Sequence, residues 1–568
     1  MILKRFTAAA AAICLTACTY LPPEYSIILP MSASAADRED YTEEAVDGII
    51  YKVYGDHAEL AESAAVYAGD LVIPSEVKGK PVTVIADRVF EENPRLTSVT
   101  IPDTVTEIGI NVFRNCQSLT SVTIPDSVTK IGNSVFSYCE SLSSVALPDS
   151  ITRISSSMFT GCYALASIEI PDSVTELGEN AFSDCRSLKA IRIPDSVTSL
   201  GDHVFSGSAI ESLILPDSVT KYGNYLCSGC NMLTEVKLHE NMKSIPAGMF
   251  CGCSELTSVD IPSSIKMIET YAFAGCYQLN ELNLPQGLEY IGISAFQDCT
   301  NLTELYVPQS VTNIASRAFG NTGISKVTLS ADSIITRFNS VFEKTEVEEI
   351  TLLGSMDRVP AYLFEDFESV RTVNLPEGIR TIELSAFSGC RYLTNIEIPS
   401  TVTWIDEGAF RYCRSLSSVT FPEGLTIIYI SAFERCYELS EIYIPASLYG
   451  IDYDAFKYCD KLTDIYYGGT EEQWKEVHIH KEGNDVLFKN VTIHYNSHPP
   501  VKNTGLSGDA NEDGKITVSD AVAVLQYIAN AEKYALTEQG IVNADCDGEE
   551  GITGGDAIKI QKMDAGID

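Results

Sequence analysis

A unit of 23 residues recurs along most of the chain and restricts the folds that the sequence can adopt. The segment LTSVTIPDSVTKIGNSVFSYCES, which starts at Leu119, recurs as LTNIEIPSTVTWIDEGAFRYCRS from Leu393. The spacing between copies is 23 residues and falls to 22 only after Leu188 and after Leu302. About seventeen copies lie between residues 68 and 461. A period of this length predicts a solenoid in which each copy forms one coil.

Each copy has the pattern of a short β-strand followed by a turn. In LTSVTIP the apolar residues alternate with polar ones, which is typical of a strand with one buried side. The Pro that follows ends the strand and opens a turn. One copy alone cannot bury its apolar side chains, but stacked copies share a continuous core. The sequence therefore predicts a repeat solenoid of about 17 coils with a parallel β-sheet.

Phe and Cys occupy fixed positions of the unit. A Phe recurs in every copy except one, where Cys227 stands in its place, and such a series of rings indicates a core position. Three residues after the Phe, twelve of the 17 Cys share one position, where other copies have Ser208, Thr322, Thr345 or Phe367. A disulfide partner or a metal ligand could not be exchanged for Phe, whereas a small buried side chain could. We therefore expect free thiols in the core.

The unit IPxSVTxIGxxAFxxC resembles the BspA-like leucine-rich repeat family of bacterial surface proteins, over about residues 45–495. The resemblance implies an α/β leucine-rich repeat solenoid that is curved and capped at both ends. The repeats are expected over residues 68–461, an N-terminal cap hairpin over 36–67 and a C-terminal cap over 462–495. Trp474 is placed to cover the open end of the core.

The outward positions of the expected strands change in character along the solenoid. They are small in the first coils, as at Ser98 and Thr100, and become acidic and aromatic later. Solenoids of this kind usually bind partners on their concave face, and exposed Tyr beside carboxylates suits a binding surface. We therefore expect a protein or polysaccharide ligand on the concave face; the alternative is an ordinary solvated sheet face. The expected contact residues are Glu304, Tyr306, Glu441, Tyr443, Asp464 and Tyr466.

The last sixty residues have a different pattern, that of a calcium-binding loop. In GDANEDGKITVSDAV, which begins at Gly508, oxygen ligands stand at loop positions 1, 3, 5, 7 and 12, and Gly514 allows the sharp turn. A helical segment follows, but none can precede, because SHPPVKNTG contains two Pro. A second, similar loop has two extra residues and an Asn at its first position. The expected ligands of two calcium ions are Asp509, Asn511, Asp513, Lys515 (through its backbone carbonyl) and Asp520 in the first loop, and Asn543, Asp545, Asp547 and Asp556 in the second.

Two such loop–helix halves without leading helices resemble a type I dockerin over residues 508–568, after a short linker at 496–507. Dockerins dock into cohesin modules of scaffoldin proteins and so assemble cellulosomes on fibre-degrading anaerobic bacteria. The first helix is expected to turn Ala521, Val524 and Ile528 toward its own fold. The matching face of the second half is more polar, so we expect cohesin binding in one orientation, mainly through the first helix. The expected cohesin contacts are Val518, Ser519, Val522, Leu525, Gln526 and Ala529.

Residues 1–35 have the features of an export signal. Lys4 and Arg5 precede an apolar run that is too short to span a bilayer. Cleavage before Ala36 would release the mature chain, whereas the LTAC motif that ends at Cys18 resembles a lipobox and would leave a lipid-anchored chain. No other apolar segment is long enough to cross a membrane. The formal net charge of −39 repels nucleic acid and anionic membranes, so neither is expected as a partner.

The sequence contains no pattern that indicates catalysis. It has seven His, and it lacks the GxSxG, HExxH and Gly-rich phosphate-binding patterns. Ser and Asp are frequent because PDSV recurs in the turn of the repeat. We therefore expect a non-catalytic, secreted cellulosome subunit, in which an adhesive solenoid is attached through a calcium-dependent dockerin. Two alternatives stay open: a lipid-anchored surface adhesin, and a hydrolase or inhibitor activity on the solenoid.

Overall fold

The structure is a computed structural model, and it covers the repeat region almost completely. It describes residues 41–63, 66–330, 338–354, 356–489 and 491–497, and in the C-terminal segment residues 510, 516, 518–531, 533–536, 541, 543–546 and 552–565. The expected export signal lies outside these residues, as does the expected linker except for Asn496 and Ser497. Among the described helices, none has the length and apolar character needed to cross a membrane.

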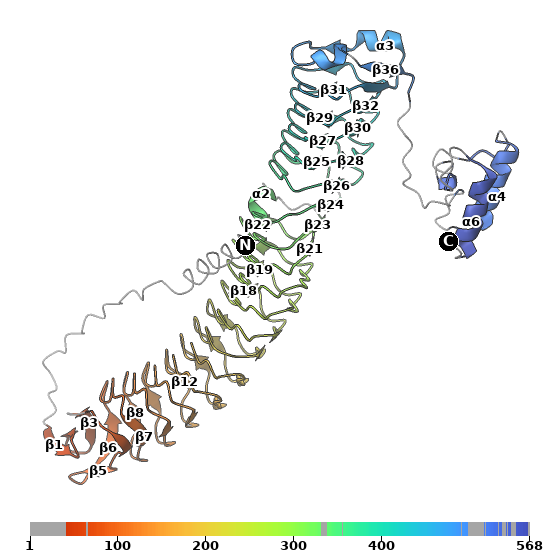
Figure 1. Cartoon of the computed structure of the whole chain (residues 1–568). Helices are drawn as coiled ribbons and strands as arrows, with labels where there is room; N and C mark the ends of the chain where they lie inside the picture. The colour runs from red at the N-terminus through yellow and green to blue at the C-terminus, as the bar shows by residue number, and fades with distance from the viewer. Residues whose placement is uncertain are drawn as a thin grey trace, which may run out of the picture.

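Two ladders of strands run along a curved solenoid (Figure 1). The long-strand ladder comprises β4 (Gly69–Val72), β7 (Leu96–Thr100), β9 (Ser121–Thr123), β11 (Ser144–Ala146), β15 (Ser212–Ile214), β17 (Glu235–Lys237), β21 (Glu304–Val307), β23 (Lys326–Ser330), β24 (Glu349–Leu353), β26 (Thr372–Asn374), β28 (Asn395–Ile396), β30 (Ser418–Thr420), β32 (Glu441–Ile444), β34 (Asp464–Tyr467) and β36 (Thr492–Tyr495). The short-strand ladder comprises β6 (Lys80–Ile85), β8 (Glu107–Ile108), β10 (Lys130–Ile131), β12 (Arg153–Ile154), β13 (Glu176–Leu177), β14 (Ser199–Leu200), β16 (Lys221–Tyr222), β18 (Ser244–Ile245), β19 (Met267–Ile268), β20 (Tyr290–Ile291), β22 (Asn313–Ile314), β25 (Arg358–Val359), β27 (Thr381–Ile382), β29 (Trp404–Ile405), β31 (Ile427–Ile428), β33 (Gly450–Ile451) and β35 (His478–Ile479).

The strands of both ladders pair in parallel, one repeat apart. Ser144 pairs with Ser121, 23 residues earlier. The two 22-residue steps of the sequence appear in the pairing of Ser199 with Lys221 and of Glu304 with Lys326. The predicted leucine-rich repeat solenoid of about 17 coils with parallel sheets is thus confirmed. The description of its class as α/β is corrected to β-solenoid, because the described repeat residues form strands and turns with a single four-residue helix, α2 (Phe338–Val341).

Stacked Phe rings form the centre of the solenoid, as predicted. Successive ring centroids lie 5.5 to 6.0 Å apart with nearly parallel planes from Phe90 to Phe205. The stack is interrupted at Cys227 and resumes at Phe250. Near α2, Phe338 stands between the rings of Phe342 and Phe364, at 5.2 and 4.9 Å, and so bridges an irregular coil.

The twelve repeat cysteines are free and buried, which confirms the predicted series of core thiols. The structure adds a hydrogen bond that the sequence did not suggest. Each thiol donates to a backbone carbonyl of the preceding coil, at sulfur–oxygen distances of 3.0 to 3.3 Å. Thr345, which replaces Cys in one coil, donates its hydroxyl to the Phe319 carbonyl at 2.8 Å in the same way. In most coils the position therefore holds a small side chain that donates a hydrogen bond, and Phe367 is the exception.

The Ser of the recurring PDSV turn also connects the coils. Ser127 donates to the Val105 carbonyl at 2.7 Å, and Ser173 donates to the Ile151 carbonyl at 2.7 Å. Ser196 repeats the bond to Val174. Each of these bonds satisfies a backbone carbonyl that the strands leave unpaired, as folded proteins require. The abundant Ser is explained by this structural role.

Different elements close the two ends of the solenoid. At the N-terminal end, β1 (Thr42–Val46), β2 (Ile49–Val53) and β3 (Ala58–Ser63) pair antiparallel, and β3 joins the short-strand ladder through β6. The two-residue strand β5 (Glu76–Val77) pairs with β6. At the C-terminal end, α3 (Glu471–Glu476) and the 3-10 helix η1 (Asp485–Phe488) separate the last strands. Trp474 of α3 packs edge-on against Tyr467 with ring centroids 5.0 Å apart.

The C-terminal segment contains two helices of equal length, α4 (Val518–Ala529) and α6 (Gly554–Ala565). They pack together through a small apolar core of Ala510, Ala521, Val524, Ala544, Ala557 and Ile560. The prediction that Ala521 and Val524 face this core is correct. The same prediction for Ile528 is wrong, because its side chain is 45% exposed at the end of the helix.

Candidate functional site

The outward positions of the long-strand ladder, here called the long-strand face, carry the acidic and aromatic residues expected to bind a ligand. Glu304 and Tyr306 lie on β21, and both are exposed, with 42% of Tyr306 accessible. Glu441 of β32 is exposed as well. These three residues stand where the sequence predicted them.

Tyr443 is a correction to the predicted contact set, because its side chain is only 3% exposed. Its hydroxyl donates to a Glu423 carboxylate oxygen at 3.0 Å, and burial, followed by this bond, raises the pKa of the phenol. The chain after β34 covers it: a Cβ added to Gly468 would lie 2.7 Å from the Tyr443 hydroxyl. Tyr443 is therefore part of the C-terminal closure rather than of an open surface.

The last pair of predicted contacts is also partly covered by the final strand. His494 of β36 stacks on Tyr466 with centroids 4.7 Å apart and lies 2.8 Å from an Asp464 carboxylate oxygen. This hydrogen bond, with a second one from Thr463, lowers the pKa of Asp464. Of the six predicted positions, only Glu304, Tyr306 and Glu441 have exposed side chains.

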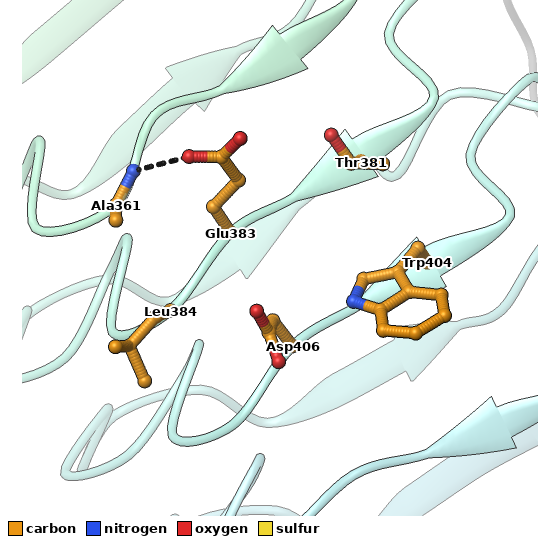
Figure 2. Close-up of a pocket in the computed structure, with 6 residues that line it drawn as sticks. All are labelled: Ala361, Thr381, Glu383, Leu384, Trp404 and Asp406. Carbon is orange, nitrogen blue, oxygen red and sulfur yellow. Dashed lines mark hydrogen bonds between the residues drawn. The ribbon is translucent and has the colours of Figure 1, made fainter.

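A cavity that the sequence did not predict lies on the other ladder. It has a volume of about 240 Å³, is shallow and open, and is lined by Ala361, Thr381, Glu383, Leu384, Trp404 and Asp406. Figure 2 shows the Trp404 ring and the carboxylates of Glu383 and Asp406 around it. Thr381 belongs to β27 and Trp404 to β29, and the other lining residues lie in the turns that follow β25, β27 and β29.

Hydrogen bonds within the coils hold both carboxylates in place. One oxygen of Glu383 accepts from the Ala361 backbone amide at 3.0 Å, and the other lies 3.4 Å from the Arg358 guanidinium. Asp406 accepts from the backbone amide of Glu407 at 2.8 Å. The acceptor groups at the cavity therefore have fixed positions before any ligand arrives.

The aromatic side of the cavity continues into the next coils. The Tyr429 ring lies 4.5 Å from the Trp404 ring, and 42% of Trp404 is exposed. Burial, with smaller contributions from Tyr449 and the carboxylates of Asp406 and Asp452, raises the pKa of Tyr429. Tyr449 is 54% exposed. An exposed strip of aromatic and acidic side chains thus follows the short-strand ladder.

A change in the repeat produces this strip, and it is visible in the sequence. The position after the buried Ile of VTxIG is Gly in six coils up to Gly292, and a Cβ at Gly132 would lie 2.6 Å from the backbone of Gly109. From Glu383 onward this position is never Gly. It carries Glu383, Asp406, Tyr429, Asp452 and His480 in successive coils. The loss of the repeat Gly is therefore the feature of the sequence that could have indicated a different surface on these coils.

In the C-terminal segment, four of the nine predicted calcium ligands are described. Asp520, Asn543 and Asp556 are almost completely buried, and Asp545 is half-buried. Asp556 accepts from the backbone amides of Cys546 and Thr553, both at 2.8 Å. The remaining predicted ligands, Asp509, Asn511, Asp513, Lys515 and Asp547, lie outside the described residues.

The predicted cohesin contacts lie on α4. Ser519, Val522, Leu525, Gln526 and Ala529 are all exposed, with 45% of Val522 and 47% of Leu525 accessible. The side chain of Val518 is not among those described. On α6 the single large exposed apolar residue among the described side chains is Ile558, at 58%.

The stacked coils define a leucine-rich repeat β-solenoid, and comparison with known proteins places it more closely. A family model described as "BspA type Leucine rich repeat region (6 copies)" matches residues 83–210, 154–280, 220–340, 266–390 and 336–463. The chain belongs to the BspA-type leucine-rich repeat family. Proteins of this family are typically extracellular or surface-associated and are generally not enzymes.

Among solved structures, a leucine-rich repeat protein from Bacteroides ovatus is 24% identical, with 81% of this chain and all of that chain covered and a TM-score of 0.39. A leucine rich cell surface protein from Faecalibacterium prausnitzii is 27% identical, with 77% and 97% covered and a TM-score of 0.36. A "Xylanase/beta-glucanase" from Ruminococcus flavefaciens is 45% identical over 64 residues. This match covers 10% of this chain and only 8% of that protein.

Proposed function

We propose that the chain is a secreted, non-catalytic subunit whose solenoid binds a protein or polysaccharide, and whose residues 508–568 form a calcium-dependent dockerin for a scaffoldin cohesin. The observation that carries the proposal is the symmetry of the C-terminal helices. Asp520 and Asp556 are each the third residue of their helix, α4 and α6, and both have no exposed surface.

Buried carboxylates at equivalent helix starts fit calcium. A carboxylate without exposure to water requires compensating charge or hydrogen bonds, and calcium prefers oxygen ligands of this kind. Asp520 would close the first loop, with Asp509, Asn511, Asp513 and the Lys515 carbonyl as its other ligands. Asp556 would close the second loop, with Asn543, Asp545 and Asp547. When bound, the ion would neutralise acidic side chains that otherwise repel one another.

The exposed apolar stripe of α4 supports a partner on this helix. Val522, Leu525 and Ile528 are each about half exposed on a helix whose opposite side is already packed on α6. Apolar side chains left over after folding indicate an interaction surface. The corresponding side of α6 offers Ile558 and the polar Gln561. This asymmetry supports binding through α4 in one orientation.

The match to the Ruminococcus flavefaciens enzyme gives independent support. It extends over 64 residues, which is close to the length of the segment 508–568 and too short to contain a catalytic domain. Two proteins that share only a piece of this size are expected to share an attachment module. The name of the relative is that of a polysaccharide-degrading enzyme, which supports an association of this chain with such enzymes.

Calorimetric titration of the full chain with a panel of type I cohesin modules tests the proposal. We expect saturable binding by at least one cohesin in calcium and none after chelation, because the loops need the ion to fold. Binding that is equally strong in chelator, or no binding to any cohesin in calcium, would reject the dockerin assignment.

The export step has its own test, because the expected signal lies at residues 1–35. Mass spectrometry of the protein from its native host should give a mature N-terminus near Ala36. A lipid-bearing Cys18 would instead support the lipid-anchored adhesin. Turnover of plant polysaccharides or peptide libraries by the solenoid would support the hydrolase alternative.

A further inference from the structure

Trp404, Tyr429, Glu383 and Asp406 place two kinds of recognition group side by side. The two rings lie against each other, with centroids 4.5 Å apart and planes 30° from parallel, and they leave Trp404 42% exposed and Tyr429 half-buried. The two carboxylates, fixed by hydrogen bonds to backbone amides, line the cavity beside Trp404. An exposed ring next to fixed acceptors is a combination that recognises a ligand with both apolar and hydroxyl surfaces.

We propose that this part of the short-strand ladder binds a neutral polysaccharide chain, with sugar rings packed on Trp404 and Tyr429 and hydroxyl groups donating to Glu383 and Asp406. The proposal rests on the proposed function of the solenoid as a binding module and names its ligand class. A pyranose ring has an apolar face of C–H groups and a rim of hydroxyls. Hydrogen bonds from these hydroxyls to ionised carboxylates are stronger than those between neutral groups.

The site is less suited to a cationic peptide. Glu383 already lies 3.4 Å from the Arg358 guanidinium, so its charge is partly compensated. The cavity is shallow and, at about 240 Å³, smaller than the roughly 300–1,000 Å³ of pockets that enclose drug-sized ligands. It offers no deep apolar pocket for a peptide anchor. A single sugar unit needs only a ring to stack on and a few acceptors at its edge.

The repeat architecture favours a polymer over a single sugar. Successive coils are about 4.8 Å apart, as neighbouring strands are in any sheet. Aromatic side chains continue from Trp404 to Tyr429 and on to the exposed Tyr449, in three neighbouring coils. Tyr453 adds a further ring that stacks on His480 at 4.0 Å. A chain that lies along the ladder therefore meets an aromatic side chain in each of these three coils.

The chain offers a direct optical reporter, because it contains only two Trp residues. Trp474 packs on Tyr467 in the C-terminal closure, away from the proposed site. In the full chain with Trp474→Phe, fluorescence reports Trp404 alone. Soluble mixed-linkage β-glucan and arabinoxylan should each be tested as titrants. We expect a saturable emission shift with at least one of them, since a stacked sugar removes water from the indole.

Affinity gel electrophoresis with the same polysaccharides measures how much the ring and the carboxylate each contribute to binding. Matched variants are compared by their retention in the gel. Trp404→Ala should weaken retention by at least about tenfold, and Asp406→Asn by about three- to tenfold. Tyr392→Ala, at an exposed ring that does not line the cavity, should leave retention unchanged. All three side chains are exposed or half-buried, and circular dichroism should show that the variants keep the fold of the parent.

Several results would overturn the proposal. These are an unchanged Trp404 emission with both polysaccharides, retention that survives Trp404→Ala, and an emission shift produced by oligolysine but by neither polysaccharide. Failure here is distinguishable from failure of the dockerin, because cohesin titration of the Trp404→Ala chain should be unaffected. Polysaccharide binding should also be unchanged in chelator, which abolishes cohesin binding in the proposed function.

Discussion

At the scale of single residues, the close stacking of the coils decides which side chains fit. The turns use residues with positive φ, and several are Tyr, as at Tyr138 with φ 59°. The Tyr138 ring lies over Gly161 of the next coil, where an added Cβ would be 2.5 Å from a ring carbon. Gly161 is therefore required twice, for its own φ of +71° and for the space that the ring occupies.

Substitution of Gly161 by Ala should destabilise the solenoid more than the same change at Gly79. Both glycines have a φ of +71°, but nothing lies within 4 Å of a Cβ at Gly79. We expect a cost of about 1–2 kcal/mol at Gly79 from the left-handed backbone. Gly161→Ala should cost roughly 1–3 kcal/mol more because of overpacking. Equal shifts of the guanidinium unfolding midpoint for both variants would show that the Tyr138 contact does not matter.

Buried thiols should make the solenoid sensitive to alkaline pH. Burial raises the pKa of Cys116 from 9.0 to about 12 and raises those of the other repeat thiols whose shifts are resolved, such as Cys139 and Cys162. A raised folded-state pKa means that the neutral thiol is favoured in the fold. Its stabilisation is complete below pH 9 and is lost as pH rises toward the folded-state value.

The free energy of unfolding should therefore fall by about 1.4 kcal/mol per pH unit for each such thiol above pH 9. Guanidinium unfolding under reducing conditions at pH 8 and pH 10.5 measures the effect. The control replaces Cys116, Cys139, Cys162 and Cys185 by Thr, the residue that the chain itself uses at position 345. The control should lose less stability over this range. An unfolding midpoint that does not change with pH in the parent chain would contradict the expectation.

At the scale of elements, each ladder or helix packs one side against the core and turns the other side outward, where it can contact a partner. On the long-strand face, the last strand and the chain after β34 cover Tyr443 and partly cover Tyr466. On the short-strand ladder, the loss of the repeat Gly leaves open positions that carry Glu383, Asp406 and Tyr429. The last coils therefore differ from the first on both sides.

The exposed stripe of α4 leads to a prediction for the C-terminal helices. Leu525→Glu should abolish cohesin binding, because it places a charge in the centre of an apolar contact. Gln561→Glu, at the matching position of α6, should weaken binding only slightly. Both side chains are exposed, so both variants should fold. Calorimetry with a cohesin that binds the parent chain measures the difference, and equal losses from the two changes would show that both helices contribute alike.

At the scale of the whole molecule, the solenoid and the pair of C-terminal helices are stabilised in different ways. The solenoid core consists of stacked Phe rings, aliphatic side chains and thiols, and each coil contacts its neighbours. Among the described residues, the helical pair buries six side chains in its own core. A module with so small a core usually needs a bound metal, a disulfide or another additional stabilising interaction to fold.

Removal of calcium should therefore unfold one part of the molecule and leave the other intact. We expect chelator to reduce the helical signal in far-UV circular dichroism, with recovery when calcium is added in excess. The thermal midpoint of the solenoid should not change. A chain without residues 508–568 serves as the control and should show no response to chelator. A chelator-induced shift of the solenoid midpoint in that control would contradict the assignment of calcium to the C-terminal segment.

The architecture of the solenoid follows from the amino-acid sequence alone. A strict period places residues 23 apart in the same environment, so the register of Ser121 with Ser144, the Phe stack and the buried thiols all follow from one-dimensional spacing. The sequence pattern also separated the buried Ala521 and Val524 from the exposed Leu525, because helical periodicity is local.

Only the tertiary structure decided which of the outward side chains stay open. Tyr443 has the same local pattern as Tyr306, but the chain that closes the solenoid covers one and not the other. Ile528 belongs to the inner stripe of α4 by spacing, yet it lies beyond the contact with α6. The cavity beside Trp404 is formed by side chains of three stacked coils, so no single repeat contains it. Exposure depends on contacts between segments distant in sequence, which the periodicity of one repeat does not contain.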